Sequence, residues 1–205
     1  SAVLSTLYAT LNVLSSSLAG YAFARMNAPG KKILFSILIG TIMVPWVVLG
    51  IPQFIVFSKI GLINSYWPWV IWGVSGSAWH IFLFRQFFSG FPRELEEAAE
   101  VDGCNRLRIF YNIVLPNALP VVATSFIFSF QWVWGDWVTA LLYLNDNLTT
   151  LPVVLAGTIY VDPQVNAIVT VTMAAVVLYA LPLVIVFFIG QRYILQGVVT
   201  SGLKG

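Results

Sequence analysis

The stretch Pro92–Pro116, PRELEEAAEVDGCNRLRIFYNIVLP, is the one long polar run in an otherwise apolar chain. Its first proline suits an opening helical position, where no backbone N–H is needed, and the acids that follow favour the positive end of a helix. Asp102-Gly103 supplies a stop signal, because glycine readily takes the left-handed conformation that ends a helix. A second helix is expected from Asn105 to about Leu115, with Pro116 at its end or at a kink. The stretch therefore predicts two short helices joined by a turn.

A spaced motif runs through both predicted helices. Glu97-Ala98-Ala99 is followed after three residues by Gly103 and, after nine more, by Ile113-x-Leu115-Pro116. This pattern resembles the EAA loop of ABC importer permeases, and all seven motif letters fall at that family's spacing. The wider frame, ELEEAAEVDG followed by IF and IVLP, is similar to the sugar-transporting branch of the maltose-permease type.

The resemblance implies a role for this loop. In that family the loop lies in the cytoplasm and docks as a coupling helix into a cleft on the ATPase subunit. The paired alanines are expected to give a helix surface that another protein can approach closely. A solvated amphipathic helix between membrane spans is the less favoured alternative. The residues expected to couple to the ATPase are Glu97, Ala98, Ala99, Asp102, Gly103, Ile113, Leu115 and Pro116.

The composition places the chain in lipid. Of its 205 residues, 59% are hydrophobic and 9% are charged, with a mean hydropathy of +0.88, whereas soluble domains carry about 25% charged residues. One cysteine excludes an internal disulfide, and one histidine excludes a histidine-cluster metal site within the chain, so no metal site is expected. The chain opens on Ser1 rather than Met, and we expect its N-terminal part to be missing.

Five stretches are long and apolar enough to cross about 30 Å of hydrocarbon. The fold class expected is thus all-α, a polytopic transmembrane helical bundle forming one permease domain. The first stretch is rich in Ser, Thr and Asn, which permit close helix packing in membranes, so we expect it to be buried against partners. The five spans are Ala2–Ala24, Ile33–Phe57, Trp67–Phe88, Leu119–Leu144 and Ala167–Gly190.

The basic residues predict the orientation. Nine of the ten lie in or beside the loop after the first span, the EAA loop and the C-terminal tail, and Lys59 stands alone in another connection. The EAA loop and the C-terminus are therefore expected in the cytoplasm, and five spans leave Ser1 outside. The family's usual core has six spans, so one upstream helix is expected to be absent here.

Two features inside the spans allow more than one interpretation. Pro45 and Pro52 should each free a backbone carbonyl in the second span, either beside a water-filled cavity or at a kink needed only for packing. His80 in the third span could mark a proton or ligand path. A hydrogen bond to a neighbouring helix is the more common use of such a histidine, and we assign it no role.

The fourth span carries the candidate substrate path, Gln131, Trp134 and Asp136. A carboxylate inside a membrane is costly enough to indicate function by default, and sugars bind to aromatic faces together with hydrogen-bonding groups. The related permeases often show Trp-Asn-Glu-Phe here, whereas this chain has Trp134-Gly135-Asp136-Trp137. An acid near the outer boundary that is simply hydrated is an equal alternative.

Three further segments resemble the same family. Tyr21–Arg25 is similar to its YAxAR sequence at the end of the first span. Thr149–Pro152 is similar to an outer TLP segment near which the extracytoplasmic binding protein would dock, and Val153–Tyr160 is expected as an outer interfacial helix. The last nine residues resemble its C-terminal tail.

The predicted function is that of a transmembrane permease subunit of a binding-protein-dependent ABC importer for a sugar or related small polar solute. No GxxxxGK[ST] phosphate loop occurs in the sequence, so this chain is not expected to be an enzyme or to bind a cofactor, and ATP-Mg would bind the partner ATPase. The expected partners are a cytoplasmic ATPase dimer, a second permease subunit, an extracytoplasmic solute-binding protein and membrane lipid, without nucleic acid. The expected location is the cytoplasmic (inner) membrane of a bacterium or archaeon. The alternative is a secondary transporter driven by an ion gradient, which would need a buried ionisable pair.

Overall fold

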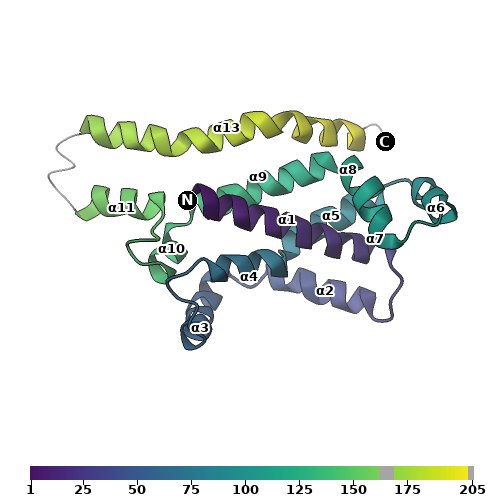
Figure 1. The fold of residues 1–205 in the computed structure, drawn as a ribbon, viewed down its shortest axis with the longest axis horizontal. Helices are drawn as coiled ribbons and strands as arrows, with labels where there is room; N and C mark the ends of the chain where they lie inside the picture. The colour runs from purple at the N-terminus through teal and green to yellow at the C-terminus, as the bar shows by residue number, and fades with distance from the viewer. Residues whose placement is uncertain (162–168, 203–205) are drawn as a thin grey trace.

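The computed structural model describes residues 1–161 and 169–202, and every regular element in that part of the chain is a helix (Figure 1). This confirms the predicted all-α bundle. The helices are α1 (Ala2–Arg25), α2 (Lys31–Ile42), α3 (Trp46–Lys59), α4 (Trp67–Ser75), α5 (Ala78–Ser89), α6 (Arg93–Val101), α7 (Arg106–Ile109), the π-helical segment η1 (Phe110–Val114), α8 (Leu115–Asn117), α9 (Leu119–Gly135), α10 (Trp137–Tyr143), α11 (Leu151–Val161) and α13 (Val169–Gly202).

Helix α1 is the centre of the bundle and packs against α4, α5 and α9. Figure 1 shows it running through the middle of the molecule, with α13 lying along the far side of α9. The face that α1 buries is largely polar and includes Ser5, Asn12, Ser16 and Ser17, each fully buried. Small hydroxyl side chains let helix backbones approach closely, and the prediction that this helix is buried against partners is confirmed.

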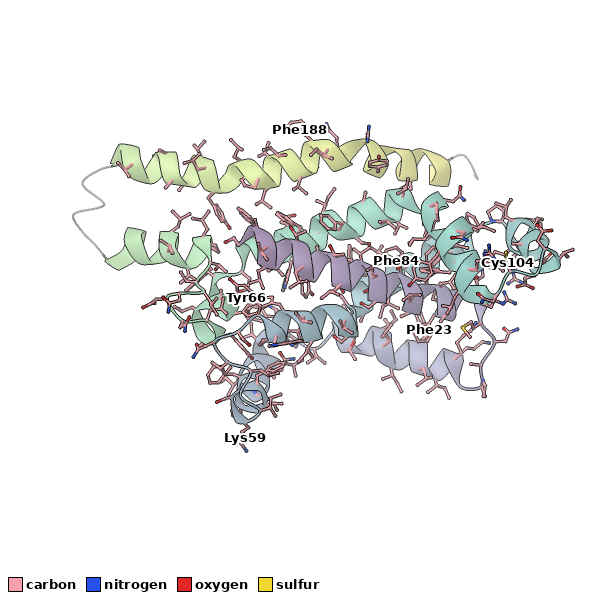
Figure 2. The ribbon with its side chains drawn as sticks, in the orientation of Figure 1. Phe23, Lys59, Tyr66, Phe84, Cys104 and Phe188 are labelled. Carbon is pink, nitrogen blue, oxygen red and sulfur yellow. The ribbon has the colours of Figure 1, made fainter. Side chains whose placement is uncertain are left out.

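The core continues from the bundle into the polar loop. Tyr21 of α1 and Phe84 and Phe88 of α5 belong to one buried cluster with Phe110 and Val114 of η1. Figure 2 shows Phe84 inside the bundle, between the ribbons of neighbouring helices. The loop is therefore packed onto the bundle by shared core residues.

The predicted span Ile33–Phe57 is wrong as a single helix. It divides into α2 and α3, which are bent by 98° at the intervening break. Pro45 is extended there, with φ −61° and ψ 127°, and occupies the N-cap position of α3. Proline has no backbone N–H to donate within a helix, so α2 does not continue through it. The carbonyl that Pro45 was expected to free belongs to Thr41, four residues earlier, and it accepts a hydrogen bond from Val44 N at 3.1 Å. Pro52, by contrast, is accommodated inside α3.

The predicted span Trp67–Phe88 is also interrupted, by Gly76 and Ser77 between α4 and α5. Gly76 has φ 73° and ψ 169°, a conformation that essentially only glycine adopts. Two hydroxyl groups of α1 bind backbone groups at the break. Ser15 Oγ donates to the Gly73 carbonyl at 2.8 Å, and Ser16 Oγ accepts from Ser77 N at 3.1 Å.

The fourth predicted span, Leu119–Leu144, breaks at Asp136 into α9 and α10. At its other end, α9 is bent by 82° from the segment Arg106–Asn117. The last predicted span corresponds to α13, whose described part begins at Val169, so Ala167 and Ile168 lie outside the described residues. The predicted helix Val153–Tyr160 corresponds to α11.

The number of spans stays a prediction. Among the described residues, two helical stretches, Ala2–Arg25 and Met173–Tyr193, are long and apolar enough to cross a membrane alone. Each of the two bent pairs would add one span if it crosses as a unit, which gives up to four.

Close packing of α1 on α5 predicts a strong effect of Gly20→Ala. A Cβ atom at Gly20 would lie 2.5 Å from Phe84 Cβ and 3.1 Å from the Ile81 carbonyl oxygen. Overpacking of this kind costs about 1–3 kcal/mol, so thermal unfolding in detergent should shift to lower temperature. Gly40→Ala in α2 is the matched control, because its Cβ meets no atom within 4 Å. Equal melting temperatures for the two variants would contradict this packing.

Candidate functional site

The polar loop lies at one end of the bundle, where α6 projects beyond α1 and α5 (Figure 1). Helix α6 begins after Pro92 and has Glu94 and Glu96 in its first turn, as the sequence predicts. It ends in a Schellman motif, in which Gly103 N donates to Glu100 O at 3.0 Å and Cys104 N donates to Ala99 O at 2.9 Å. Gly103 has φ +80°, so the predicted left-handed stop is confirmed.

The second predicted helix is present but is not a regular α-helix. Asn105 caps it, with its side-chain oxygen accepting from Arg108 N at 2.9 Å. After one turn, α7 widens into the π-helical segment Phe110–Val114 before returning to α-helix in α8. π-helical segments are rare and are frequent at functional sites. The helix ends at Asn117, one residue after Pro116, close to the predicted end.

The motif residues of α6 face two directions. Glu97 and Ala98 are exposed, whereas Ala99 is 5% exposed and packs in the core cluster with Ile109 and Phe110. The prediction that both alanines form one outer surface is therefore wrong. Successive helical residues are about 100° apart, since a turn takes 3.6 residues. Of the two alanines, only Ala98 lies on the exposed side of α6 with Glu97.

The remaining motif residues divide in the same way. Asp102, Gly103 and Pro116 are exposed, and Ile113 and Leu115 are half-buried against the core. Three apolar side chains of the same loop are also exposed, namely Leu95, Val101 and Leu107, at 48%, 89% and 62%. Exposed apolar side chains gathered beside a polar loop are typical of a protein-binding surface. We call the exposed residues Leu95, Glu97, Ala98, Val101, Asp102 and Leu107 the outer face of the loop.

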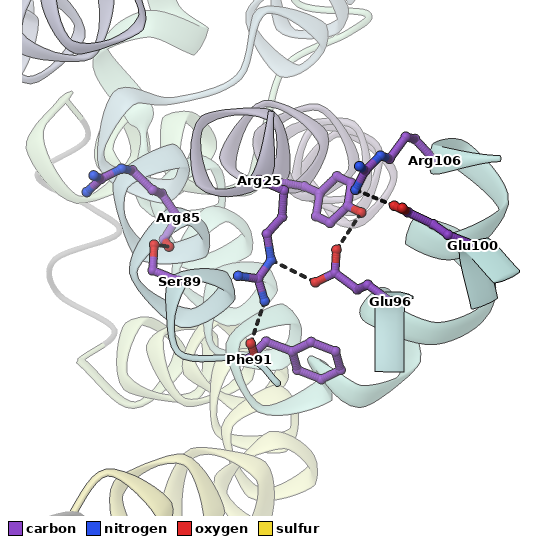
Figure 3. A network of polar contacts seen from close by, with 8 residues as sticks. Arg25, Arg85, Ser89, Phe91, Glu96, Glu100 and Arg106 are labelled. Carbon is purple, nitrogen blue, oxygen red and sulfur yellow. Dashed lines mark hydrogen bonds and ion pairs between the residues drawn. The ribbon is translucent and has the colours of Figure 1, made fainter. Parts of the chain in front are cut away.

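The inner side of α6 holds a charge that the sequence analysis did not single out. Glu96 is 4% exposed, and its Oε1 lies 2.7 Å from Nε of Arg25, whose side chain is 5% exposed. These two atoms lack hydrogen-bond alignment, so their contact is an ion pair. The other carboxylate oxygen of Glu96 accepts from the Tyr21 hydroxyl at 2.9 Å. Figure 3 shows Arg25 reaching both Glu96 and the carbonyl of Phe91, to which it donates a hydrogen bond.

A sequence signal for this contact existed. Tyr21 and Arg25 are four residues apart, hence on one face of α1, and they are the tyrosine and arginine of the YAxAR sequence. What the sequence could not supply was their partner, 75 residues from Tyr21. A second ion pair of α6, Glu100 with Arg106, has the same 2.7 Å separation but is 39% and 57% exposed.

The three residues of the predicted substrate path have separate surroundings. Trp134 is buried, stacks on Phe130 and Tyr179, and donates from Nε1 to the Tyr179 carbonyl at 3.2 Å. Asp136 is half-buried and caps α10 by accepting from Thr139 N at 3.0 Å. Gln131 is exposed and lines a cleft of about 310 Å³ between α9 and α13.

His80 belongs to a buried hydrogen-bonded cluster that joins three helices. Its ring nitrogens lie 3.3 Å from Asn12 Nδ2 of α1 and 3.2 Å from Ser129 Oγ of α9. Asn12 also donates to Ser129 at 2.8 Å and accepts from Ser16 Oγ at 3.1 Å. This is the bonding to neighbouring helices that the sequence analysis favoured.

Comparisons with known proteins agree on one family. Its sequence profile, described as a binding-protein-dependent transport system inner membrane component, matches residues 13–200. The arabinooligosaccharides transport system permease protein AraQ of Halalkalibacterium halodurans is 32% identical over 98% of this chain and 71% of its own length. The lactose transport system permease protein LacG of Rhizobium radiobacter is 34% identical over 93% of this chain and 69% of its own.

A further relative and a solved structure are also similar to this chain. The osmoprotective compounds uptake permease protein GgtD of Synechocystis sp. is 32% identical over 92% of this chain, which spans 63% of its length. A chain from the crystal structure of a bacterial ABC transporter involved in the import of the acidic polysaccharide alginate superimposes with a TM-score of 0.75 at 25% identity, over 93% of this chain and 73% of that one. Since the family profile matches most of the sequence and the fold agrees, this chain belongs to the family of binding-protein-dependent transport system inner membrane components.

Proposed function

We propose that this chain is a permease subunit of an ATP-driven importer for a sugar or a related small polar solute. The outer face of the loop carries the proposal. It presents motif residues Glu97, Ala98 and Asp102 together with exposed apolar side chains, and the opposite side of α6 is fixed to the bundle. Such a surface fits a coupling contact with a separate ATPase subunit.

The solute class is supported by the relatives. Two are named for the transport of arabinooligosaccharides and lactose, and the similar solved structure is of an alginate importer. The relative from Synechocystis is named for osmoprotective compounds, so the class extends to other small polar solutes. Gln131 and Asp136 remain our candidates for groups along the solute path.

The proposed partners are an ATPase dimer at the outer face, a second permease subunit and an extracytoplasmic solute-binding protein. Helix α2 has no buried residue, and Phe57 is the one buried residue of α3. Their apolar surfaces are suited to the second permease subunit or to lipid. We place the EAA loop and the C-terminus in the cytoplasm, following the lysines and arginines.

The proposed mechanism needs two discrete arrangements of the bundle. Closure of the ATPase dimer on ATP would displace α6, and the bundle would change between inward-open and outward-open states. An ion-gradient mechanism would require a buried ionisable pair within the membrane. His80 is instead bonded to the neutral groups of Asn12 and Ser129, and Asp136 caps a helix, so the family match and the site both favour the ATP-driven importer.

The orientation can be tested by cysteine labelling. Val101→Cys, in a Cys104→Ser background, places a thiol on the outer face at a position that is 89% exposed. We expect an impermeant maleimide to modify it in inside-out vesicles but not in intact cells. Lys59→Cys, at the exposed end of α3 and remote from Cys104 (Figure 2), should show the reverse pattern. Modification of Val101→Cys in intact cells would overturn the orientation.

The angle at Gly103 should matter for docking. Its φ of +80° makes a β-branched residue strained by about 1–2 kcal/mol, although a Cβ there would meet no atom within 4 Å. We expect Gly103→Val to reach normal membrane levels but to co-purify less ATPase. Gly103→Asn is the matched control, because asparagine tolerates the left-handed region. Undiminished ATPase recovery with the valine variant would show that this turn does not set the docking angle.

Asp136→Asn tests the charge on the proposed solute path. The amide oxygen can still accept from Thr139 N, so the cap of α10 should survive. If the carboxylate binds solute, uptake should fall about tenfold or more, as for loss of a hydrogen bond to a charged group. The assay uses whichever of labelled lactose and arabinooligosaccharide the unsubstituted transporter takes up. Exposed Asp146→Asn is the control, and equal uptake by both variants would leave Asp136 as a cap alone.

A further inference from the structure

Helix α6 carries two adjacent glutamates with opposite surroundings. Glu97 is exposed on the outer face, whereas Glu96 is 4% exposed and points into the bundle. The proposed contact with the ATPase partner uses Glu97. The buried carboxylate of Glu96 has no place in that contact, and its role has to be sought inside the chain.

The partners of Glu96 come from the end of α1. Tyr21 binds one carboxylate oxygen and Arg25 pairs with the other, at 2.9 and 2.7 Å. Arg25 also binds the Phe91 carbonyl, in the connection that leads from α5 into α6 (Figure 3). One arginine of α1 therefore holds both the start of α6 and the chain that enters it.

Aromatic rings surround this contact. The ring of Tyr21 packs on Phe88 at 5.9 Å and on Phe110 at 5.2 Å between centroids, and both phenylalanines are fully buried. In such a water-poor environment an ion pair is stronger than at the surface. A lost partner would leave an uncompensated buried charge, so α6 cannot easily separate from α1.

Without this contact α6 has a pivot at each end. Pro92 precedes it in an extended conformation, with ψ 128°, and Gly103 follows it at φ +80°. Among the helices, α6 packs mainly against α7 and η1, which come next in the chain. Apart from its contact with α1, α6 is therefore linked to the centre of the bundle mainly through α7 and η1.

Helix α1 is well placed to pass on a displacement. It packs against α4, α5 and α9, and its buried polar groups bind across to His80 of α5 and Ser129 of α9. A helix held on three sides moves together with its neighbours.

We propose that Tyr21, Arg25 and Glu96 form a latch that makes α6 and α1 move as one body, so that displacement of α6 by the ATPase is transmitted to the bundle. This inference rests on the proposed function. Tyr21, Arg25 and Glu96 are positioning residues, which act through α6 rather than touching the solute or ATP. A purely structural role would require the contact only for folding and assembly.

The test measures the mobility of a spin label on α1 before and after the ATPase is trapped with ATP and vanadate. A nitroxide is attached at Thr6→Cys, in a Cys104→Ser background, on the exposed side of α1 far from Arg25. The permease is purified with its ATPase in lipid nanodiscs, and vanadate traps the ATP-bound state. We expect trapping to change the ratio of mobile to immobile label by about fivefold, the lower end of ordinary allosteric coupling.

Glu96→Gln should abolish this response while the ATPase still co-purifies and still hydrolyses ATP in a vanadate-sensitive manner. Glu100→Gln is the matched control, because it breaks the exposed ion pair of the same helix and such pairs contribute little. Its response should equal that of the unsubstituted complex. Tyr21→Phe keeps the packed ring but loses one bond to Glu96, and it should give a reduced response even if Glu96→Gln fails to accumulate.

Full responses in Glu96→Gln and Tyr21→Phe would overturn the latch, as would an unsubstituted complex that hydrolyses ATP without any change at Thr6. An unsubstituted complex that retains no ATPase would instead overturn the proposed function. The co-purification and hydrolysis measurements thus separate the two failures.

Discussion

Buried backbone groups need hydrogen-bond partners wherever a helix breaks, and this constraint shapes the centre of the molecule. At the break between α4 and α5, the Gly73 carbonyl accepts from Gly76 N and from Ser15 Oγ of α1, and Ser77 N donates to Ser16 Oγ of α1. An α1 made only of leucine and valine would bury more apolar surface but would remove the acceptor of Ser77 N and one of the two donors to the Gly73 carbonyl. The hydroxyl-rich α1 therefore contributes hydrogen bonds to the break between α4 and α5, and it also carries the Asn12 cluster that binds α5 and α9.

The sequence predicts the membrane bundle well and its interruptions poorly. Long apolar stretches are visible because hydropathy is averaged over about 19 residues, and the same averaging hides a break of two or three residues. Pro45 was visible as a possible kink, but the sequence alone does not give the size of the bend, which is 98°. The break at Asp136 has a local signal, an acid that can cap the next helix, but the sequence analysis considered this acid only as a solute-binding group or a hydrated side chain. The π-helical segment Phe110–Val114 has no pattern that distinguishes it from α-helix.

The polar loop likewise has features that the sequence predicts and features that it does not. Its turn was predictable because Gly103 acts through its own backbone, and the φ of +80° follows from local chemistry. The surroundings of Ala99 and Glu96 were not predictable, because they depend on Tyr21, Arg25 and Phe110, which approach only when the whole bundle is formed. Motif letters mark which residues matter without saying which side of the helix faces the core. A motif can therefore mark a loop without showing which of its residues, here Ala99, pack in the core.

The buried pair of Arg25 and Glu96 is difficult to explain by stability alone. Replacing a buried ion pair with apolar residues of similar volume is often neutral or stabilising by about 1–4 kcal/mol, and the rings of Tyr21, Phe88 and Phe110 already provide an apolar setting for such a replacement. An apolar contact, however, tolerates sliding, whereas an ion pair supported by directional hydrogen bonds holds one relative position of two helices. Glu96 and Glu97 are adjacent in α6. The helix therefore exposes the carboxylate of Glu97 on its outer face and is fixed to α1 through the carboxylate of Glu96. A position-specific contact at that point is what transmission of a displacement requires, and it is not what stability alone would favour.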